Sequence, residues 1–241
     1  MAPLLESLKA ESPSIGKMMP ILVDDGSSDN TVEIARRFEK ELGLRVIKHE
    51  HNKGLGAAIL TGLSTVISEA KDTDIIVMLD TDNSHNPNHI PGMIKLLEKG
   101  NDIVIASRYA RGGKEVGLVY WRSLGSKIIS LMLTCVFNVR GVRDYTSGYR
   151  AYTGAIIRKG FAVYGNNLVS ETSFVCMAEL LVKLCSVGAK VAEFPLTLRY
   201  DLKQGISKMD IPHTLVRYMH LVLSQGLKIN WIHWWHVHHD I

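Results

Sequence analysis

Between Met19 and Ser107, short apolar runs alternate with amphipathic stretches, and this alternation constrains the fold of the chain more than any other feature. Such a pattern is typical of repeated strand and helix units on a parallel sheet. We expect strands at Pro20–Val23, Leu44–Lys48, Asp74–Leu79 and Asp102–Ala106, and helices at Asn30–Leu42, Leu55–Ala70 and Ile90–Lys99. The spacing of Asn30 and Glu33 predicts a capping box at the start of the first helix.

The regular alternation ends after Ser107. A glycine-bearing loop, RYARGGKEVG, leads into an apolar helix expected at Trp121–Asn138, and the polar turn VRDYTSGYR follows. Beyond the turn we expect a helix at Ser170–Ser186, a strand at Lys190–Arg199 and a helix at Met209–Ser224. Since no linker, repeat or low-complexity tract intervenes, we predict one domain over residues 1–241, with a nucleotide-binding part (1–107) and an acceptor-binding part (108–241).

Composition excludes several classes of protein. The net charge of the 241 residues is +4 and no long run of Lys or Arg occurs, which argues against a nucleic-acid-binding protein. A mild positive charge suits phosphate-bearing substrates or anionic lipid surfaces. Cys135, Cys176 and Cys185 lie in apolar runs without metal-site spacing, so we expect buried free thiols in a reducing compartment.

Two segments bear on membrane contact. The start of the chain, MAPLLESLKAE, has no signal-peptide pattern, so we expect a cytoplasmic protein. The apolar segment Ile128–Val139 falls short of the roughly 20 residues that span a bilayer, which leaves a core helix or a helix lying on the membrane face. The tail Asn230–Ile241 carries Trp231, Trp234 and Trp235 among histidines, a composition that fits a membrane interface, a subunit contact, a frayed end or adventitious metal binding.

Acidic residues follow two of the predicted strands. Asp24 and Asp25 lie just past the first expected strand, and Asp80 and Asp82 lie just past the third. Ligands of open parallel sheets bind outside the carboxyl ends of the strands, so both pairs point to one crevice. In extended backbone Asp80 and Asp82 would share a face and could bind Mg²⁺ or Mn²⁺ together. For either pair alone a turn or a helix cap is the better explanation, but the two together favour a site.

Five motifs in the sequence carry a resemblance to a known family: VDDGSSDNT, NKGLGAAILTG, LDTDNSHNP, SRYARGG and TSGYRAY. In order and spacing, from about Ala2 to Lys208, they resemble family 2 glycosyltransferases, and most of all the dolichyl-phosphate mannose synthase group. The resemblance implies the GT-A fold, a Rossmann-like α/β sandwich with a mostly parallel central sheet. Family members carry a further strand before the helix that here starts at Ala2, so we expect the usual first strand to be missing.

The resemblance also implies roles for individual residues. Asp24 and Asp25 would contact the base and ribose of the donor, and Asp80 and Asp82 would form a DxD metal site, with Asp82 taken as catalytic. Leu202 stands where the synthases carry an arginine, so Arg199 and Lys208 are expected to bind the donor instead. The phosphate-contacting set is expected to comprise Arg108 and Arg150 as catalytic residues and Arg111, Arg122 and Ser126 on the acceptor side.

Three further expectations accompany these roles. Gly54, Gly56 and Gly62 are expected to permit close helix and sheet packing. His85 could touch substrate or be a polar surface histidine. A hydroxyl acceptor would require a carboxylate base, for which Asp144, Glu171 and Glu179 are candidates, although capping or solvation explains each of them better.

The predicted activity is inverting, metal-dependent transfer of a sugar from GDP-mannose or UDP-glucose to a polyprenyl or dolichyl phosphate. The enzyme would work at the cytoplasmic face of a membrane. The alternatives are transfer to a cell-surface saccharide or another small acceptor, and an inactive module that binds a nucleotide sugar.

Overall fold

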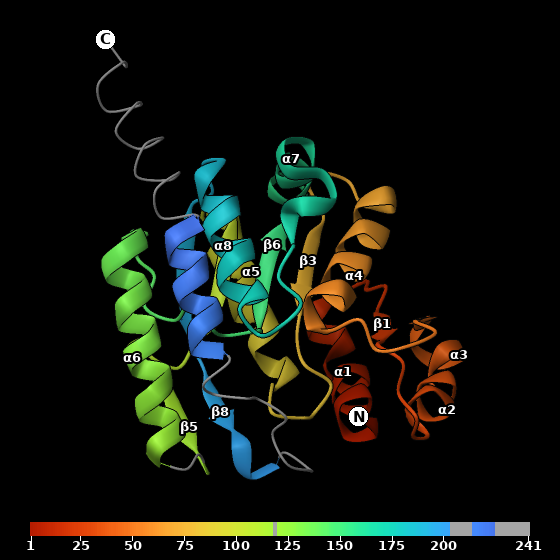
Figure 1. The fold of residues 1–241 in the computed structure, drawn as a ribbon. Helices are drawn as coiled ribbons and strands as arrows, with labels where there is room; N and C mark the ends of the chain where they lie inside the picture. Colours follow the sequence, from red (N-terminus) through yellow and green to blue (C-terminus); the bar gives the residue numbers. More distant parts are fainter. Residues whose placement is uncertain (118–119, 203–213, 225–241) are drawn as a thin grey trace.

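The computed structural model of the chain describes residues 1–117, 120–202 and 214–224, and of residues 121, 122 and 202 it describes the backbone only. It has a mixed α/β fold with helices on both faces of a central sheet (Figure 1). The strands are β1 (Ile21–Asp24), β2 (Arg45–Lys48), β3 (Ile75–Met78), β4 (Ile103–Ser107), β5 (Lys114–Val116), β6 (Arg150–Thr153), β7 (Val191–Pro195) and β8 (Thr197–Arg199). The α-helices are α1 (Ala2–Ile15), α2 (Thr31–Arg36), α3 (Glu39–Leu42), α4 (Leu55–Glu69), α5 (Ile90–Glu98), α6 (Tyr120–Phe137), α7 (Gly154–Tyr164) and α8 (Cys176–Ser186). The short 3₁₀ turns are η1 (Pro87–His89), η2 (Gly165–Leu168) and η3 (Tyr200–Leu202), and a further helix covers 214–224.

The central sheet has the strand order β3-β6-β4-β7. β6 is antiparallel to both β3 and β4, so those two strands run in the same direction, and β7 is parallel to β4. The expected direction of the sheet is therefore confirmed, with β6 as the reversed strand. In this register Arg150 lies opposite Met78 of β3 and Ile105 of β4, so the turn before β6 reaches the carboxyl ends of both strands.

Successive side chains of β4 point to opposite faces of the central sheet and enter two different core clusters. Ile103 and Ile105 belong to a core cluster formed with α4, α7 and α8, whereas Val104 and Ala106 belong to a second cluster with α1 and α5. Every residue of β4 is buried, as expected for a strand covered on both faces. The sheet therefore has an apolar core on each side, and its strand ends are left for chemistry.

β1 and β2 form a separate parallel pair. Among the described residues no strand pairing joins this pair to the central sheet, although Leu22 of β1 and Val77 of β3 pack into the same core cluster. The edge of β3 that faces away from β6 is unpaired, and its Ile75 is 36% exposed. Strand pairing among the described residues is therefore interrupted between the β1–β2 pair and the central sheet.

Several predicted elements differ in detail. Two helices, α2 and α3, replace the single helix expected at Asn30–Leu42. The expected capping box is wrong, since the Asn30 side chain makes no capping hydrogen bond; Asp29 Oδ1 accepts from Thr31 N at 3.0 Å. The strand expected at Lys190–Arg199 is divided between β7 and β8, which belong to different sheets. The helix expected from Ser170 begins at Cys176, and the start expected at Met209 lies outside the described residues.

Two surface expectations can be compared with the structure. Cys176 is buried, but Cys135 is exposed on α6, so the expectation that all three thiols are buried is wrong for Cys135. None of the helices in the described ranges combines the length and the apolar character that crossing a bilayer requires. The tail from Asn230 lies outside those ranges.

Two glycines of α4 provide a test of the packing. A Cβ on Gly56 would lie 1.7 Å from the carbonyl oxygen of Glu171, whereas one on Gly62 would lie 3.4 Å from Val23 Cγ2. We expect Gly56→Ala to lower the free energy of unfolding by at least about 1–3 kcal/mol, because the backbone at Glu171 must move. Gly62→Ala should be neutral or stabilise by up to about 1 kcal/mol, since alanine favours helix.

Urea unfolding followed by circular dichroism measures both changes through the transition midpoint. Equal stability of the two variants would contradict the close contact between α4 and the chain at Glu171.

Candidate functional site

The candidate site lies at the carboxyl ends of β3 and β4. Asp80 follows β3, Arg108 follows β4, and the turn that leads into β6 passes the same edge. Three of the motifs noted in the sequence, LDTDNSHNP, SRYARGG and TSGYRAY, therefore meet at this edge. The fourth, NKGLGAAILTG, packs against the chain that leads into α8, because Gly56 N at the start of α4 donates to Thr172 O at 3.2 Å.

Asp80 and Asp82 stand on a turn. The chain turns at Thr81 and Asp82, so the expectation that extended backbone places both carboxylates on one face is wrong. Asn83 has a φ of 66°, and Ser84 donates from N (3.0 Å) and from Oγ (2.5 Å) to Asp82 Oδ1. The turn is therefore built by its own side chains.

The Asp80 carboxylate has open space beside it. The residue is exposed, and within the described ranges no hydrogen bond or ion pair of its side chain is found. A Cβ on the facing Gly148 would lie 3.4 Å from Asp80 Oδ1. A glycine at this point leaves the carboxylate accessible from the turn before β6.

The acidic turn carries groups of the type that bind hard divalent cations. The side chains of Asp80 and Asp82 end in carboxylate oxygens, which Mg²⁺ and Mn²⁺ prefer. Among the described residues no group of three or more His, Cys, Asp or Glu side chains is placed to hold a metal. The remaining ligands would be water and substrate phosphates, as is usual for Mg²⁺.

Asp25 holds the loop before α4. Its carboxylate accepts from Lys53 N at 2.9 Å, from Gly54 N at 2.8 Å, and pairs with His49 Nδ1 at 2.7 Å. Burial raises the pKa of Asp25, but these hydrogen bonds outweigh it and the pKa lies below its usual value. Asp25 therefore fixes the conformation of the loop before α4. Its contact with the donor stays a prediction.

Asp24, at the end of β1, and His49, directly after β2, lie beside Asp25 and are buried. Asp24 is 3% exposed and accepts from Ser27 N at 3.2 Å. His49 is 7% exposed, and its Nε2 lies 3.0 Å from Thr61 Oγ1 on α4. Sequence reasoning missed His49, for which the only signal was its place at the end of a strand.

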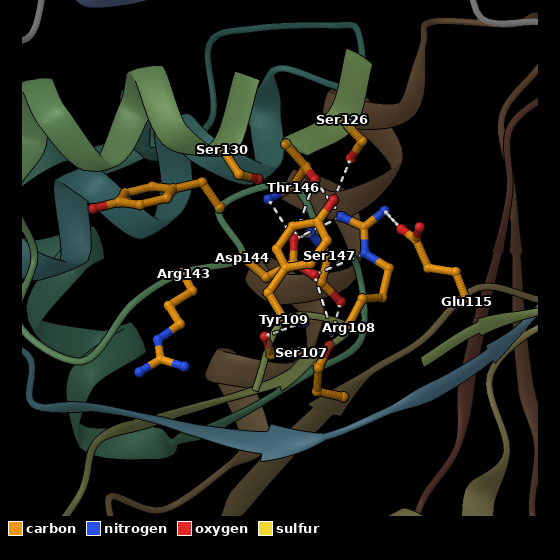
Figure 2. A network of polar contacts seen from close by, with 12 residues as sticks. Ser107, Arg108, Tyr109, Glu115, Ser126, Ser130, Arg143, Asp144, Thr146 and Ser147 are labelled. Carbon is orange, nitrogen blue, oxygen red and sulfur yellow. Dashed lines mark hydrogen bonds and ion pairs between the residues drawn. The ribbon is translucent and has the colours of Figure 1, made fainter. Parts of the chain in front are cut away.

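Arg108 is bound by protein groups. Its Nε and Nη2 donate to the two carboxylate oxygens of Asp144 at 2.8 and 2.7 Å, and Nη2 also donates to Thr146 Oγ1 (Figure 2). Its Nη1 lies 3.4 Å from Glu115 Oε1. Because the side chain is 9% exposed and its donors are engaged, the structure argues against the predicted phosphate contact.

The pair Arg108–Asp144 is electrostatically strong. Burial lowers the pKa of Arg108, but Asp144 outweighs this effect and raises it above the usual value. Burial raises the pKa of Asp144, and Arg108 outweighs it in turn, so the pKa lies below 3.8. Both groups are charged at neutral pH and fix the 144–147 turn.

Arg150 is also internal. It is fully buried, and it donates to Met177 O at 2.7 Å and to Tyr145 O at 2.8 Å. A guanidinium without solvent exposure cannot reach a phosphate in this conformation. The structure therefore argues against the predicted catalytic role and assigns Arg150 to joining β6 with α8.

The other predicted residues are scattered. Arg111 is exposed, and Ser126 Oγ on α6 accepts from Tyr109 OH at 3.0 Å. Arg199 forms a bidentate pair with Asp201 at 2.8 and 2.7 Å. The side chain of Arg122 and all of Lys208 lie outside the described residues.

The three candidate bases are engaged in ion pairs. Asp144 binds Arg108 at 2.7 Å, Glu179 binds Lys183 at 2.6 Å, and Glu171 binds Arg217 at 3.0 Å. Glu179 also accepts from two backbone amides, Ser170 N and Glu171 N. The capping or solvation favoured for them in the sequence is therefore wrong for Asp144 and Glu179, which are buried and paired with basic side chains.

His85 is 4% exposed, so the expectation of a polar surface histidine is wrong. Its Nδ1 lies 3.0 Å from Asp80 N, and its ring stacks on Tyr149 with centroids 5.0 Å apart. The residue thus lies directly beneath the acidic turn.

Comparison with known proteins places the chain among sugar-transferring proteins. A family model described as Glycosyl transferase family 2 matches residues 1–162. The chain is 32% identical over 178 residues to a dolichol-phosphate mannosyltransferase of Pyrococcus furiosus, a match that covers 73% of this chain and 47% of that protein. It is 30% identical over 191 residues to a polyprenol monophosphomannose synthase of Mycolicibacterium smegmatis, covering 78% and 69%. The chain thus spans about half the length of the first relative and two thirds of the second.

Solved structures confirm the fold. Glucosyl-3-phosphoglycerate synthase from Mycobacterium tuberculosis superposes with a TM-score of 0.57 at 18% identity, covering 94% of this chain and 75% of that one. A second mycobacterial protein superposes with a TM-score of 0.61 at 17% identity, covering 95% and 71%. One structure of the synthase contains Mn²⁺, uridine diphosphate and glucosyl-3-phosphoglycerate. At these identities the likeness supports the GT-A architecture alone.

The Arg108–Asp144 pair yields a matched test. Asp144→Asn removes the bidentate counter-charge of the buried Arg108 and leaves it paired with Glu115 Oε1 at 3.4 Å, so we expect a loss of about 3 kcal/mol in the free energy of unfolding. Asp201→Asn breaks a similar bidentate pair with Arg199, but that pair is exposed, so the melting temperature should not change measurably.

The effect of Asp144→Asn should depend on pH in one direction. The pKa of Asp144 is lowered on folding, so the stabilisation is complete above the unfolded value of 3.8 and is lost as pH falls through the folded pKa. Chemical unfolding at pH 7 and at pH 3 measures this. If the difference in free energy of unfolding between wild type and Asp144→Asn were larger at pH 3 than at pH 7, the stabilising role of the buried ion pair would be contradicted.

Proposed function

The chain belongs to glycosyl transferase family 2, and from this premise we propose that it moves a sugar from a nucleoside diphosphate sugar to a polyprenyl or dolichyl phosphate. The two curated relatives are named for mannose transfer to lipid phosphates, which supports this acceptor class. GDP-mannose and UDP-glucose remain the candidate donors.

The observation that carries the choice of acceptor is the pairing of the candidate bases. Each of the three carboxylates, Asp144, Glu179 and Glu171, forms an ion pair with an arginine or lysine side chain. A sugar hydroxyl must lose its proton to a base as it attacks, whereas a phosphate oxygen is already anionic and needs none. The three ion pairs therefore favour a phosphate acceptor over a saccharide hydroxyl.

The reaction would be a direct displacement. A phosphate oxygen of the acceptor attacks the anomeric carbon, the bond from that carbon to the nucleoside diphosphate breaks, and the anomeric configuration inverts. Asp80 and Asp82 would hold Mg²⁺ or Mn²⁺, which would supply positive charge to the leaving diphosphate. The loop fixed by Asp25 would line the donor side, and Gly148 would keep the approach to Asp80 open.

We further propose that the chain binds to the membrane surface that holds its acceptor. α6 presents Tyr120, Leu124, Ile128 and Leu131 on one face, exposed by 69, 38, 56 and 66%. The helix at 214–224 presents Leu215, Val216, Met219 and Leu223, exposed by 45, 67, 47 and 63%. Their opposite faces enter one core cluster through Leu133, Phe137, Tyr218 and Leu221. Ile128–Val139 is thus half core helix and half apolar surface.

A partition assay tests the transfer. We expect labelled sugar to move from GDP-mannose or UDP-glucose into organic solvent when the chain, polyprenyl phosphate and Mn²⁺ are present, and to stay in water with chelator. Asp80→Asn should reduce the rate by at least about 100-fold, because it removes charge from the proposed metal site. Asp80 is a cleaner target than Asp82, whose carboxylate also accepts from Ser84.

Label that moves only to a soluble saccharide would contradict the lipid acceptor and favour the saccharide alternative. Donor binding without any transfer would favour the inactive binding module.

Liposome flotation tests the membrane contact. Val216→Asp places a charge on the exposed apolar face at 214–224, and we expect it to reduce binding to anionic liposomes by at least about fivefold. Val163→Asp is the matched control, since Val163 on α7 is a valine of similar exposure (60% against 67%) on another helix. Equal flotation of the two variants would rule out this face as the membrane contact.

A further inference from the structure

His85 is a buried polar residue to which the proposed reaction gives no role. It follows the acidic turn and is 4% exposed. One of its contacts is with the backbone of Asp80, and another is with the ring of Tyr149. These two contacts show how the side chain could act on the acidic turn.

The contact with Asp80 has a fixed polarity. A backbone amide can only donate, so His85 Nδ1 accepts the Asp80 N–H at 3.0 Å and the neutral ring carries its proton on Nε2. The bond closes a loop of six residues around the turn, from Asp80 to His85. It holds the peptide that leads into the Asp80 side chain, beyond the last ladder pair of β3 at Met78.

Tyr149 keeps the imidazole in place. The two rings are stacked, with an interplanar angle of 25° and centroids 5.0 Å apart. Tyr149 is fully buried, and its hydroxyl donates to Asn86 O at 3.0 Å, one residue beyond His85. The same tyrosine therefore supports the ring and the backbone next to it, which leaves the imidazole little freedom to rotate.

We infer that His85 is a positioning residue for the metal and diphosphate site. Its Nδ1 lone pair fixes the Asp80 peptide, and through it the direction in which the carboxylate meets a divalent cation. The inference rests on the proposed function, because it assigns Asp80 to the cation. Groups that orient a ligand from behind in this way typically change metal affinity by 10–100-fold when they are removed.

Three substitutions separate the hydrogen bond from the ring. His85→Asn keeps an acceptor, since Oδ1 of asparagine falls close to the position of Nδ1. His85→Gln carries the same amide one methylene further out and cannot place its oxygen there. His85→Phe keeps a ring to stack on Tyr149 and has no acceptor.

The measurement is Mn²⁺ affinity of the full chain, by calorimetry with and without a nucleoside diphosphate, beside the melting temperature of each variant. We expect His85→Phe and His85→Gln to weaken Mn²⁺ binding by at least tenfold. His85→Asn should stay within about threefold of wild type, although it loses the stacking on Tyr149 and is expected to melt at a lower temperature. Metal affinity and stability would then follow different orders among the variants.

Asp80→Asn distinguishes failure of this inference from failure of the proposed site. Wild-type Mn²⁺ affinity in Asp80→Asn would overturn the metal site itself. Loss of binding in Asp80→Asn with wild-type affinity in His85→Phe or His85→Gln would overturn the positioning role alone. An equal loss in His85→Asn, His85→Gln and His85→Phe would also overturn it, since the hydrogen bond would not be the cause.

Discussion

The buried ion pair between Arg108 and Asp144 is the contact on which the arrangement of the site depends. It joins the end of β4 to the turn at 144–147, two segments that lie 36 residues apart in the chain. That turn feeds β6, which enters the sheet between β3 and β4 and places Gly148 against Asp80. Because a buried charge must be paired, the two side chains specify this path of the chain strongly.

The two internal arginines change how the basic residues of the site are understood. From sequence, Arg108 and Arg150 resemble phosphate ligands, since they stand among small and aromatic residues near strand ends. In the structure their donors point to Asp144 and to the carbonyls of Met177 and Tyr145. Charge on the leaving diphosphate would therefore be met by a cation on Asp80 and Asp82. Arginines in the site would act as supports for the loops.

Local pattern predicted the parts of the fold that local forces build. The βα alternation up to Ser107 located β1 to β4, because buried strands and amphipathic helices carry their own periodicity. α7 was missed together with β6, the strand that leads into it. β6 has four residues, as β1 to β3 have, but it is held by pairing with β3 and β4 on both sides, a contact between distant segments. For the same reason the sequence could not divide the strand expected at Lys190–Arg199 between two sheets.

The acidic residues of the site could be predicted from the sequence, but the residues that hold them in place could not. Asp25, Asp80 and Asp82 follow strands, and that rule is readable in sequence. The partners that decide what each group can do, such as Asp144 for Arg108 or His85 for the Asp80 amide, come together through the turn and loop geometry. Exposure of the Asp80 carboxylate depends likewise on Gly148, whose meaning emerges only when β6 is placed beside β3.

In the proposed reaction Asp80, and neither internal arginine, forms the centre that meets the donor phosphates. Anomalous scattering from a crystal of the chain with Mn²⁺ and a nucleoside diphosphate measures this directly. We expect a Mn²⁺ peak about 2.1 Å from an Asp80 carboxylate oxygen, with diphosphate oxygens on the same ion and Arg108 still paired with Asp144. A diphosphate held by Arg108 or Arg150, with no Mn²⁺ at Asp80, would contradict it.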